Sequence, residues 1–393
     1  MNETARKGAV LFAGHSYYHN WYLSRELRKL GWIADTLNID NNPRNQMYYH
    51  GEDYKLDYGR EGYNLEKEIR FFKEAIDKYD IFHFCGAGGL QFMRNTKAVF
   101  GEHYPDRWEV RLLKNQFNKK IVYANNSCHD GVLKSSFSEW GPFSVCADCA
   151  WRDVPSACSD EKMEAWGTVR NELADYQIMY DGNRKDFNLA PNIHLVPQYY
   201  CLDKNFWHPD LLVPANYLLP YSKDTVKIYH AVGNFDSRTA VDHRNVKSTH
   251  IYFPTVESLK SEGYNVELVF VKDVPNKEVR YYQVQADIVV DMLTFGFFGA
   301  NVREALMLGK PVVCYLRPEW LETMRAELPD YVDEMPVVSA TPETVYDVLK
   351  DLVTNPDKRK EIGVRSRKFA EKWHSSEAGA KRLDEIYSSL LNG

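Results

Sequence analysis

The sequence lacks a long hydrophobic run. Its 393 residues include no apolar stretch of about 18 residues, the length that a membrane-spanning helix needs. The start of the chain, Met1 to Lys7, is polar, and the apolar run from Ala9 to Ala13 is too short for a secretory signal. We therefore expect no integral membrane segment and a cytoplasmic location, with attachment to a membrane surface left open.

The sequence also lacks an excess of positive charge. Lys and Arg number 49 against 55 Asp and Glu, which gives a net charge of −6, so nucleic-acid binding is not indicated. Hydrophobic residues make up 44% and charged residues 26%, an ordinary globular balance that excludes wholesale disorder. The length predicts two or three domains.

Cysteine is sparse, and its distribution is uneven. Of the seven cysteines, Cys85, Cys201 and Cys314 stand alone and are expected to be reduced thiols, which suits a reducing compartment. The other four are Cys128, Cys146, Cys149 and Cys158. Cys146 and Cys149 have the C-x2-C spacing of one edge of a zinc site, and the other two could complete it. The alternative is four reduced thiols in a loop-rich insert.

What the sequence does contain is a regular alternation of strand and helix patterns. In the first half we expect strands at 8–13, 33–39, 79–84, 120–124, 177–180 and 194–196; in the second, at 226–231, 266–271, 287–290 and 312–316. Helical patterns separate most of them, which predicts an α/β protein with parallel sheets.

Prolines near 205–222 indicate a linker, which would divide the chain into two similar α/β domains. The first covers 1–222 and carries the cysteine-bearing insert, 128–160. The second covers 223–375, and the final helix, 376–393, is expected to pack back on the first. Ligands of such sheets bind at the carboxyl ends of the strands, so a cleft between the domains is the expected site.

The most informative segment is 287–316, in which a glycine turn lies between a strand and a helix. Gly299, Ala300 and Asn301 begin that helix, where free N–H groups and the helix dipole suit a phosphate. Glu304 follows one turn later, and its carboxylate can accept hydrogen bonds from the vicinal hydroxyls of a ribose. The plain alternative is a glycine turn that caps a surface helix.

This segment resembles the donor-binding motif of group-1 GT-B glycosyltransferases, the retaining type. The match runs from Gly299 through Glu304-Ala305-Leu306-Met307-Leu308-Gly309-Lys310-Pro311-Val312-Val313. The resemblance implies a GT-B fold, that is, two Rossmann-like domains whose parallel sheets face each other across a cleft, and it implies that Glu304 holds the ribose. The family has a second Glu eight residues earlier that contacts the donor sugar. Here position 296 is Gly, so recognition of the sugar differs or is supplied elsewhere.

Other segments extend the resemblance to most of the chain. Arg244 and Lys247 are similar to the family's basic loop and imply contacts to a diphosphate. Asp273 and Val274 end a strand where the family's nucleobase lies. The remaining positions that the resemblance assigns to the donor are Phe298, in the glycine turn, and Gly14 and His15, in the first loop.

Two residues of the first domain are candidates for catalysis. His83 lies near the end of a strand, where the family has a His that contacts the donor sugar; the alternative is a packed core histidine. Asp130 follows another strand end and could orient an acceptor hydroxyl or act as a base, or it could be a structural carboxylate of a turn.

The expected function is transfer of a sugar from a UDP- or GDP-sugar to an unidentified acceptor, such as a glycan, a lipid-linked molecule or a protein. No Asp-x-Asp pair occurs in the sequence, which favours metal-independent transfer with no required cofactor. Retention of the anomeric configuration is what the resemblance implies. Two alternatives are a nucleotide-sugar 2-epimerase of the same fold and a non-catalytic protein that binds sugars or nucleotides.

Aromatic residues are abundant at 14%, and many of them crowd the N-terminal loops. The cluster consists of Tyr17, Tyr18, Trp21, Tyr48, Tyr49, Tyr54, Tyr58 and Tyr63. Aromatic rings stack on the apolar faces of sugars. We expect this cluster to be a platform for the acceptor, with core packing as the alternative.

Overall fold

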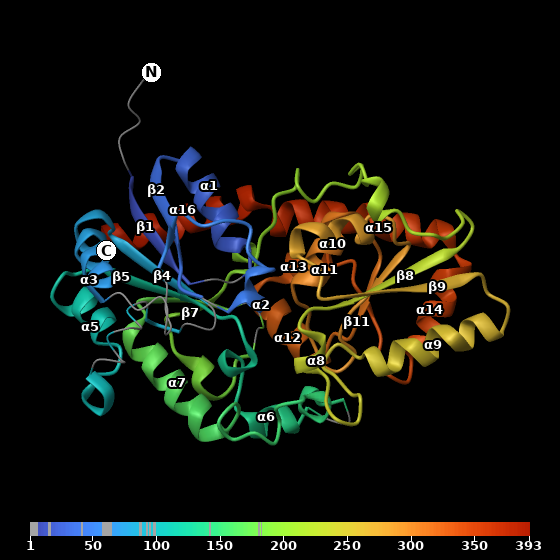
Figure 1. Cartoon of the computed structure of the whole chain (residues 1–393), viewed down its shortest axis with the longest axis horizontal. Helices are drawn as coiled ribbons and strands as arrows, with labels where there is room; N and C mark the ends of the chain where they lie inside the picture. Colours follow the sequence, from blue (N-terminus) through green and yellow to red (C-terminus); the bar gives the residue numbers. More distant parts are fainter. Residues whose placement is uncertain are drawn as a thin grey trace.

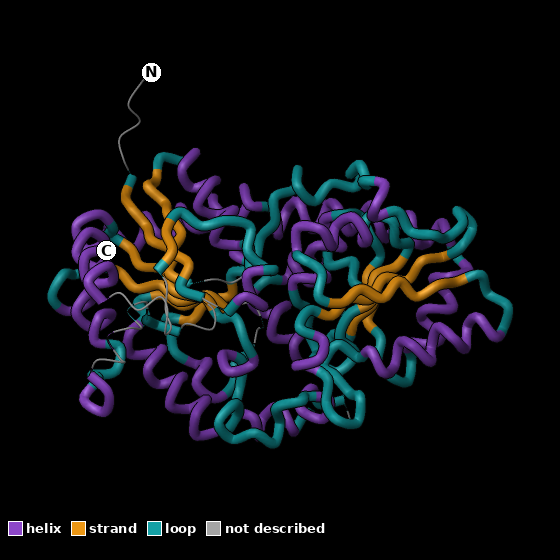
Figure 2. The backbone as a smooth tube through the Cα atoms, in the orientation of Figure 1, coloured by secondary structure: helices purple, strands orange, loops and turns teal. Residues whose placement is uncertain are grey.

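The chain folds into two α/β domains that lie side by side (Figure 1). The computed structural model describes residues 7–14, 17–40, 42–56, 65–85, 89–91, 93, 96, 100–140, 143–179, 181 and 183–393. Each domain is built around a parallel sheet, and helices lie on both faces of both sheets (Figure 2).

The first domain contains a seven-stranded sheet in the order β3-β2-β1-β4-β5-β6-β7. Its strands are β1 (Gly8–Ala13), β2 (Trp32–Asn38), β3 (Tyr54–Lys55), β4 (Ile81–Cys85), β5 (Lys120–Ala124), β6 (Tyr176–Met179) and β7 (Ile193–Leu195). Its longer helices are α1 (His19–Lys29), α3 (Leu65–Lys78), α5 (Trp108–Asn115) and α7 (Asp160–Leu173). Every residue of β1 is buried, and alternate residues belong to different apolar clusters, because helices cover both faces.

The second domain contains a five-stranded sheet in the order β12-β11-β10-β8-β9. Its strands are β8 (Val226–Val232), β9 (Val266–Lys272), β10 (Ile288–Val290), β11 (Val312–Cys314) and β12 (Val338–Ser339). Its helices include α8 (Phe235–Arg238), α9 (Thr249–Ser261), α10 (Asn276–Gln283), α11 (Ala300–Met307), α12 (Pro318–Glu327), α13 (Pro329–Asp333), α14 (Val345–Thr354) and α15 (Pro356–His374).

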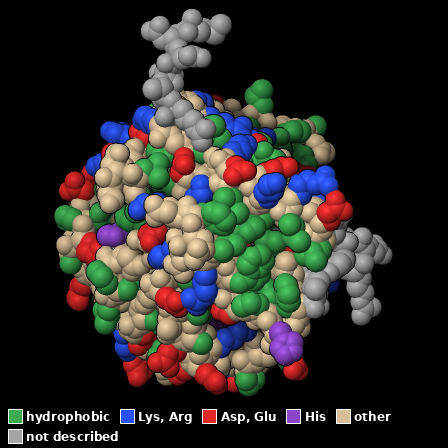
Figure 3. All heavy atoms as spheres, turned by 90° about the vertical axis from the view of Figure 1, so that its left-hand side faces the viewer, with side chains coloured by type: hydrophobic (Ala, Val, Ile, Leu, Met, Phe, Trp, Pro, Cys, Tyr) green, Lys and Arg blue, Asp and Glu red, His purple; other side chains and the backbone are tan. Residues whose placement is uncertain are grey.

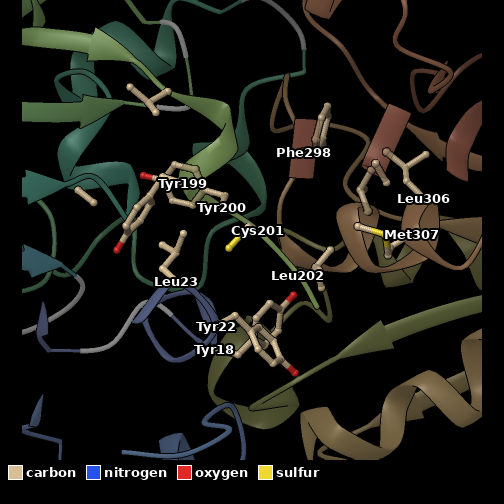
Figure 4. Packing of buried hydrophobic residues seen from close by; sticks show 14 of the residues in the cluster. Tyr18, Tyr22, Leu23, Tyr199, Tyr200, Cys201, Leu202, Phe298, Leu306 and Met307 are labelled. Atoms are coloured by element: carbon tan, nitrogen blue, oxygen red, sulfur yellow. The ribbon is translucent and has the colours of Figure 1, made fainter. Parts of the chain in front are cut away.

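The two domains share one apolar core. Side chains of α1, of the segment 199–202 and of α11 pack in the same buried cluster, among them Leu23, Tyr200, Leu202 and Leu306 (Figure 4). The domains therefore meet in a packed contact beside the cleft.

The last helix, α16 (Ser376–Asn392), lies against the first domain. The carboxylate of Asp384 accepts hydrogen bonds from Lys7 Nζ at 2.7 Å and from Trp32 Nε1 at 2.8 Å. Gly379 permits the approach, since a Cβ there would lie 2.6 Å from the carbonyl oxygen of Gln198. The chain thus crosses to the second domain after residue 202 and returns at 375.

The cysteine-bearing insert extends from the first domain to the second. It carries two short helical turns, Cys128–Asp130 and Val145–Asp148, and one helix, α6 (Lys134–Ser138), which lies below the gap between the two sheets in Figure 1. Asp148 Oδ2 accepts a hydrogen bond from Thr294 Oγ1 of the second domain at 3.0 Å. The insert therefore closes one side of the cleft.

The four cysteines of the insert are free thiols. Burial, followed by the neighbouring thiols, raises the pKa of Cys128 to about 12 and that of Cys146 to about 11. Within the described ranges, no group of three or more His, Cys, Asp or Glu side chains is arranged to hold a metal ion.

The described part of the chain contains no helix that is both long and apolar enough to span a bilayer. On the end of the molecule formed by the first domain, basic, acidic and hydrophobic side chains are interspersed (Figure 3). This mixture agrees with the near balance of charge in the sequence.

Candidate active site

A cavity of about 260 Å³ lies between the two domains. Several of its lining residues lie just after strands: Asn126 is two residues beyond β5, Gly233 follows β8 and Asp273 follows β9. The carboxyl ends of strands from both sheets therefore meet at one cavity, which is where parallel α/β sheets bind ligands.

The glycine turn and the first turn of α11 form one wall. Gly299, Ala300 and Asn301 line the cavity. Asn301 Oδ1 accepts a hydrogen bond from Gln283 Nε2 at 2.9 Å, and this bond fixes the amide at the helix start. The first N–H groups of a helix have no partner within it, so this wall can bind an anion such as a phosphate.

Glu304 lies deep in the same wall, with 3% of its surface exposed. Its Oε1 accepts hydrogen bonds from Tyr18 Oη and from Asn276 Nδ2, both at 2.8 Å, and its Oε2 accepts one from Gln283 Nε2 at 3.1 Å. Burial raises the pKa of this carboxyl, and the three hydrogen bonds oppose the rise. Because a carboxylate has about four acceptor positions, one remains for a ligand.

The contacts of Glu304 also connect the domains. Tyr18 belongs to the first domain, and His50 Nε2 of that domain lies 2.7 Å from Oδ1 of Asn276 in the second. The other ring nitrogen of His50 lies 2.6 Å from Tyr22 Oη. A buried polar chain therefore crosses the interface at the carboxylate to which the resemblance assigns the ribose.

Three cations line the cavity: Lys247, Arg238 and Arg303, the last of which lies over the ring of Tyr200. Lys247 Nζ forms an ion pair with Asp291 Oδ1 at 2.7 Å, and the Asp291 side chain is fully buried. Arg238, the last residue of α8, is the second cation. The sequence analysis missed Arg238; the available signal was an arginine five residues after Gly233, the glycine that follows β8.

A histidine of the first domain also lines the cavity, and it too was missed. Nδ1 of His19 lies 2.8 Å from the carbonyl oxygen of Cys201, so this nitrogen carries the proton and Nε2 carries the lone pair. Burial lowers the pKa of His19 to about 3, so the imidazole is neutral. Nε2 is buried and has no hydrogen-bond partner in the described structure.

Of the predicted donor residues, seven line this cavity: Lys247, Asp273, Val274, Gly299, Ala300, Asn301 and Glu304. Gly14 does not; its N–H donates to the carbonyl of Leu37 at 3.1 Å, and its φ of +94° permits contact with the backbone of Cys85. Phe298 packs against Trp320 and His374 instead. His15 lies outside the described residues.

Arg244 also does not line the cavity. Its Nε donates to Asp242 Oδ2 at 2.7 Å, and its guanidinium donates to the carbonyl of Ala147 in the insert at 2.9 Å. These partners direct the side chain to the contact between insert and second domain, so the expected role in diphosphate binding has no support in this geometry.

His83 is buried in the first domain and does not line the cavity. Its Nδ1 lies 2.5 Å from Tyr387 Oη of α16, and its ring stacks on Tyr199 with centroids 5.0 Å apart. Burial lowers its pKa to about 3. This is the packed core histidine that the sequence left as the alternative to a residue facing the cleft.

Asp130 also lies outside the cavity lining. It is 2% exposed, pairs with Arg170 at 3.2 Å and accepts a hydrogen bond from Trp166 Nε1 at 2.8 Å. The backbone N–H of Asn126 donates to it at 2.9 Å. The geometry is that of a structural carboxylate which fixes the turn after β5.

The aromatic residues of the N-terminal cluster lie in several different places in the structure. Tyr17 and Tyr48 line the cavity, and Tyr18 is buried against Glu304. Tyr49 donates to Asp40 at 2.6 Å, and Trp21 packs beneath the guanidinium of Arg25. Tyr54 is exposed on β3, and Tyr58 and Tyr63 lie outside the described residues. The cluster is thus not one continuous platform.

A scan against protein-family models finds no match, and a search of curated proteins finds none either. Solved structures do match over nearly the whole chain. Sucrose-phosphate synthase from Thermosynechococcus elongatus has a TM-score of 0.59 and 15% identity, covering 98% of this chain and 99% of its own. HepE from Anabaena, solved in complex with UDP, has a TM-score of 0.55 and 12% identity, covering 97% and 100%.

A third match is named as an enzyme of a different class. A putative UDP-N-acetylglucosamine 2-epimerase from Listeria monocytogenes has a TM-score of 0.53 and 13% identity, covering 99% of this chain and 98% of its own. At these identities the likeness is one of fold. The two parallel-sheet domains, the cavity between them and these matches together show that the chain has the GT-B fold.

Proposed function

We propose that the protein is a glycosyltransferase that moves a sugar from a nucleoside diphosphate sugar to an acceptor hydroxyl. The observation that carries the proposal is the meeting of three features at one cavity: the start of α11, the carboxylate of Glu304 and the cations Arg238 and Lys247. A diphosphate, a ribose and a counter-charge are what these features suit.

The proposed donor pose follows from these chemistries. The base lies near Val271 and Val274, the ribose reaches Glu304, and the diphosphate lies at the start of α11. The transferred sugar then extends toward His19, whose neutral Nε2 can accept a hydrogen bond from a sugar hydroxyl. UDP is the first nucleotide to test, because the matched HepE was solved with it.

The proposed mechanism depends on the leaving group. As the bond between the anomeric carbon and the diphosphate breaks, negative charge develops on the diphosphate. Arg238, Lys247 and the N–H groups of α11 stabilise that charge more strongly in the transition state than in the ground state. We further propose that transfer needs no divalent metal, since the sequence lacks Asp-x-Asp, and that the anomeric configuration is retained, as the resemblance implies.

Calorimetric titration with UDP tests the donor site. A simple Lys247→Met change would leave the fully buried Asp291 charged and unpaired, so the protein could unfold for that reason alone. The double variant Lys247→Met, Asp291→Asn removes both charges and is expected to bind UDP about 100-fold more weakly at near-normal stability. Lys260→Met, which removes a half-buried cation of α9 that pairs with Glu267 away from the cavity lining, is the control.

Incubation with UDP-sugars tests the reaction. Transfer, or slow release of UDP, supports the transferase, and the anomeric signals of the product by NMR test retention. A second candidate is a 2-epimerase, favoured by the match to the Listeria protein; a changed sugar still attached to UDP would support it. UDP binding without any turnover would contradict both and favour a binding protein.

A further inference from the structure

A second, larger cavity lies between the insert and the second domain. Its volume is about 620 Å³, within the range of small-molecule sites. Trp140 and Phe143 of the insert line one side, and Tyr315 and Arg317, which follow β11, line the other. Asn183 of the first domain also lines this cavity.

The loop after β10 separates this cavity from the first. Phe295 and Phe297 line the first cavity. Between them, the carbonyl of Gly296 accepts a hydrogen bond from the N–H of Arg317 at 2.8 Å, and Arg317 lines the second cavity. A Cβ on Gly296 would lie 3.0 Å from the Cβ of Arg317, so a larger residue would crowd this wall. The contact between Gly296 and Arg317 is thus the point at which the linings of the two cavities meet.

The second cavity has unused hydrogen-bond donors. The Arg317 guanidinium lies 3.6 Å from the ring centroid of Trp140 and donates to Asn183 Oδ1 at 2.9 Å, so both side chains are held in place. Nδ2 of Asn183 and Nε of Arg317 are buried and have no partner in the described structure. Asn183 itself is only 4% exposed. Two fixed donors indicate a ligand that presents oxygen acceptors.

The charges around the cavity nearly cancel. Lys185 pairs with Glu139 at 2.9 Å, and Arg184 pairs with Glu327 at 2.7 Å. The remaining charged lining residues are Arg317 and Glu319, one of each sign. A neutral ligand therefore fits better than an anion. Neutral oxygens together with three aromatic side chains are the chemistry of saccharide recognition, because C–H groups of a sugar contact the rings while its hydroxyls bind the donors.

We propose that the cavity of Trp140, Asn183, Tyr315 and Arg317 binds the acceptor and that the acceptor is a neutral saccharide; this assignment rests on the proposed transferase function. The acceptor hydroxyl oxygen forms a bond to the anomeric carbon of the donor. The bond from that carbon to the diphosphate oxygen breaks, its electron pair stays on the diphosphate, and the hydroxyl proton leaves with the nucleoside diphosphate. Gly296, where the related family has a Glu, leaves the wall without a side chain at this point, and the reacting end of the acceptor has to pass the wall there to reach the donor.

The test is calorimetric titration of the full chain with neutral trisaccharides, namely maltotriose, cellotriose and chitotriose, and with the anionic trigalacturonate. UDP is titrated separately into the same samples. We expect a neutral trisaccharide to bind without UDP. Arg317→Gln and Asn183→Ala should each weaken that binding about tenfold, by loss of a hydrogen bond to the ligand, and leave UDP affinity unchanged. The control is Arg325→Gln, an exposed charge of α12 paired with Asp333.

Three results would overturn the assignment: no binding of any neutral trisaccharide by protein that binds UDP, preference for trigalacturonate, or equal effects of Arg317→Gln and Arg325→Gln. If trisaccharide binding depends on Arg317 but UDP does not bind, the saccharide site stands and the proposed transferase function fails. Asn183→Ala removes only an amide, so it keeps the test valid if Arg317→Gln unfolds.

Discussion

The two domains contribute to the cavity in different ways. In the second domain, the residues at the cavity come largely from three continuous segments, 229–233, 271–279 and 292–304, in which strands run directly into turns or helices. In the first domain, Tyr17, Tyr48, Asn126 and Tyr200 come from four separate segments. A site built from one segment can be inferred from local sequence, whereas a site assembled from distant segments depends on packing.

The largest expected effect is a loss of stability when Asp130 of the first domain is replaced. Its absence would contradict the structural role of this residue and, with it, the contrast between the two domains. Asp130→Ala should lower the free energy of unfolding by about 3–5 kcal/mol, because it leaves the fully buried guanidinium of Arg170 without its counter-charge. Urea denaturation measures the change. Glu172→Ala, which removes an exposed partner of Arg111, should change stability by about 0.5 kcal/mol or less. Unchanged stability with lost activity would instead favour the catalytic role.

The next effect sharpens the contrast between two arginines of the second domain. Arg238→Met should weaken UDP binding about 10- to 100-fold, because a hydrogen bond to a charged group contributes about 1.5–3 kcal/mol. Arg244→Met should leave UDP affinity nearly unchanged, because Asp242 and Ala147 hold that side chain away from the cavity. The reverse ranking in calorimetric titrations would restore the assignment that the sequence favoured.

The smallest effect of a single residue is the acid sensitivity that each buried histidine adds, and most of these histidines belong to the first domain. Burial lowers the pKa of His19, His50 and His83 there to about 3, and in the second domain that of His230 similarly. In the unfolded chain these groups titrate near 6.5, so below that pH the unfolded state binds protons that the folded state does not. Their contribution to stability is therefore present above pH 6.5 and is lost as the pH falls.

Urea denaturation at pH 7.5 and pH 5.5 measures this loss, which should total about 1.4 kcal/mol over the interval for a single histidine. His83→Gln can keep a hydrogen bond to Tyr387 but no longer titrates, so its stability should fall less steeply with acid than that of the unmodified protein. Equal slopes for the two proteins would show that His83 does not contribute.

Much of the fold could be predicted from the sequence because the longer strands are buried and apolar. Except for β3 and β12, each strand coincides with a segment predicted as one. Those two exceptions are edge strands of two residues each, too short to carry a periodic pattern.

The sequence predicted some residues of the site and missed others, because only some of them belong to local motifs. Glu304 and Lys247 belong to local motifs and line the cavity. His83 was expected to face the cleft because it lies near the end of a strand, but α16, more than 290 residues later, covers it through Tyr387. The sequence also offers no local sign that Arg170 would neutralise Asp130 or that Cys201 would orient His19.

The return of α16 has a consequence for the synthesis of the protein. Leu202 donates its N–H to the carbonyl of His374 and accepts from the N–H of Ser376, both at 2.8 Å, so the outgoing and returning chains are joined side by side. The first domain can finish its core only after the last helix has left the ribosome. A fragment that ends at the domain boundary would expose the surface around Trp32 and His83, so the two halves are not separable modules.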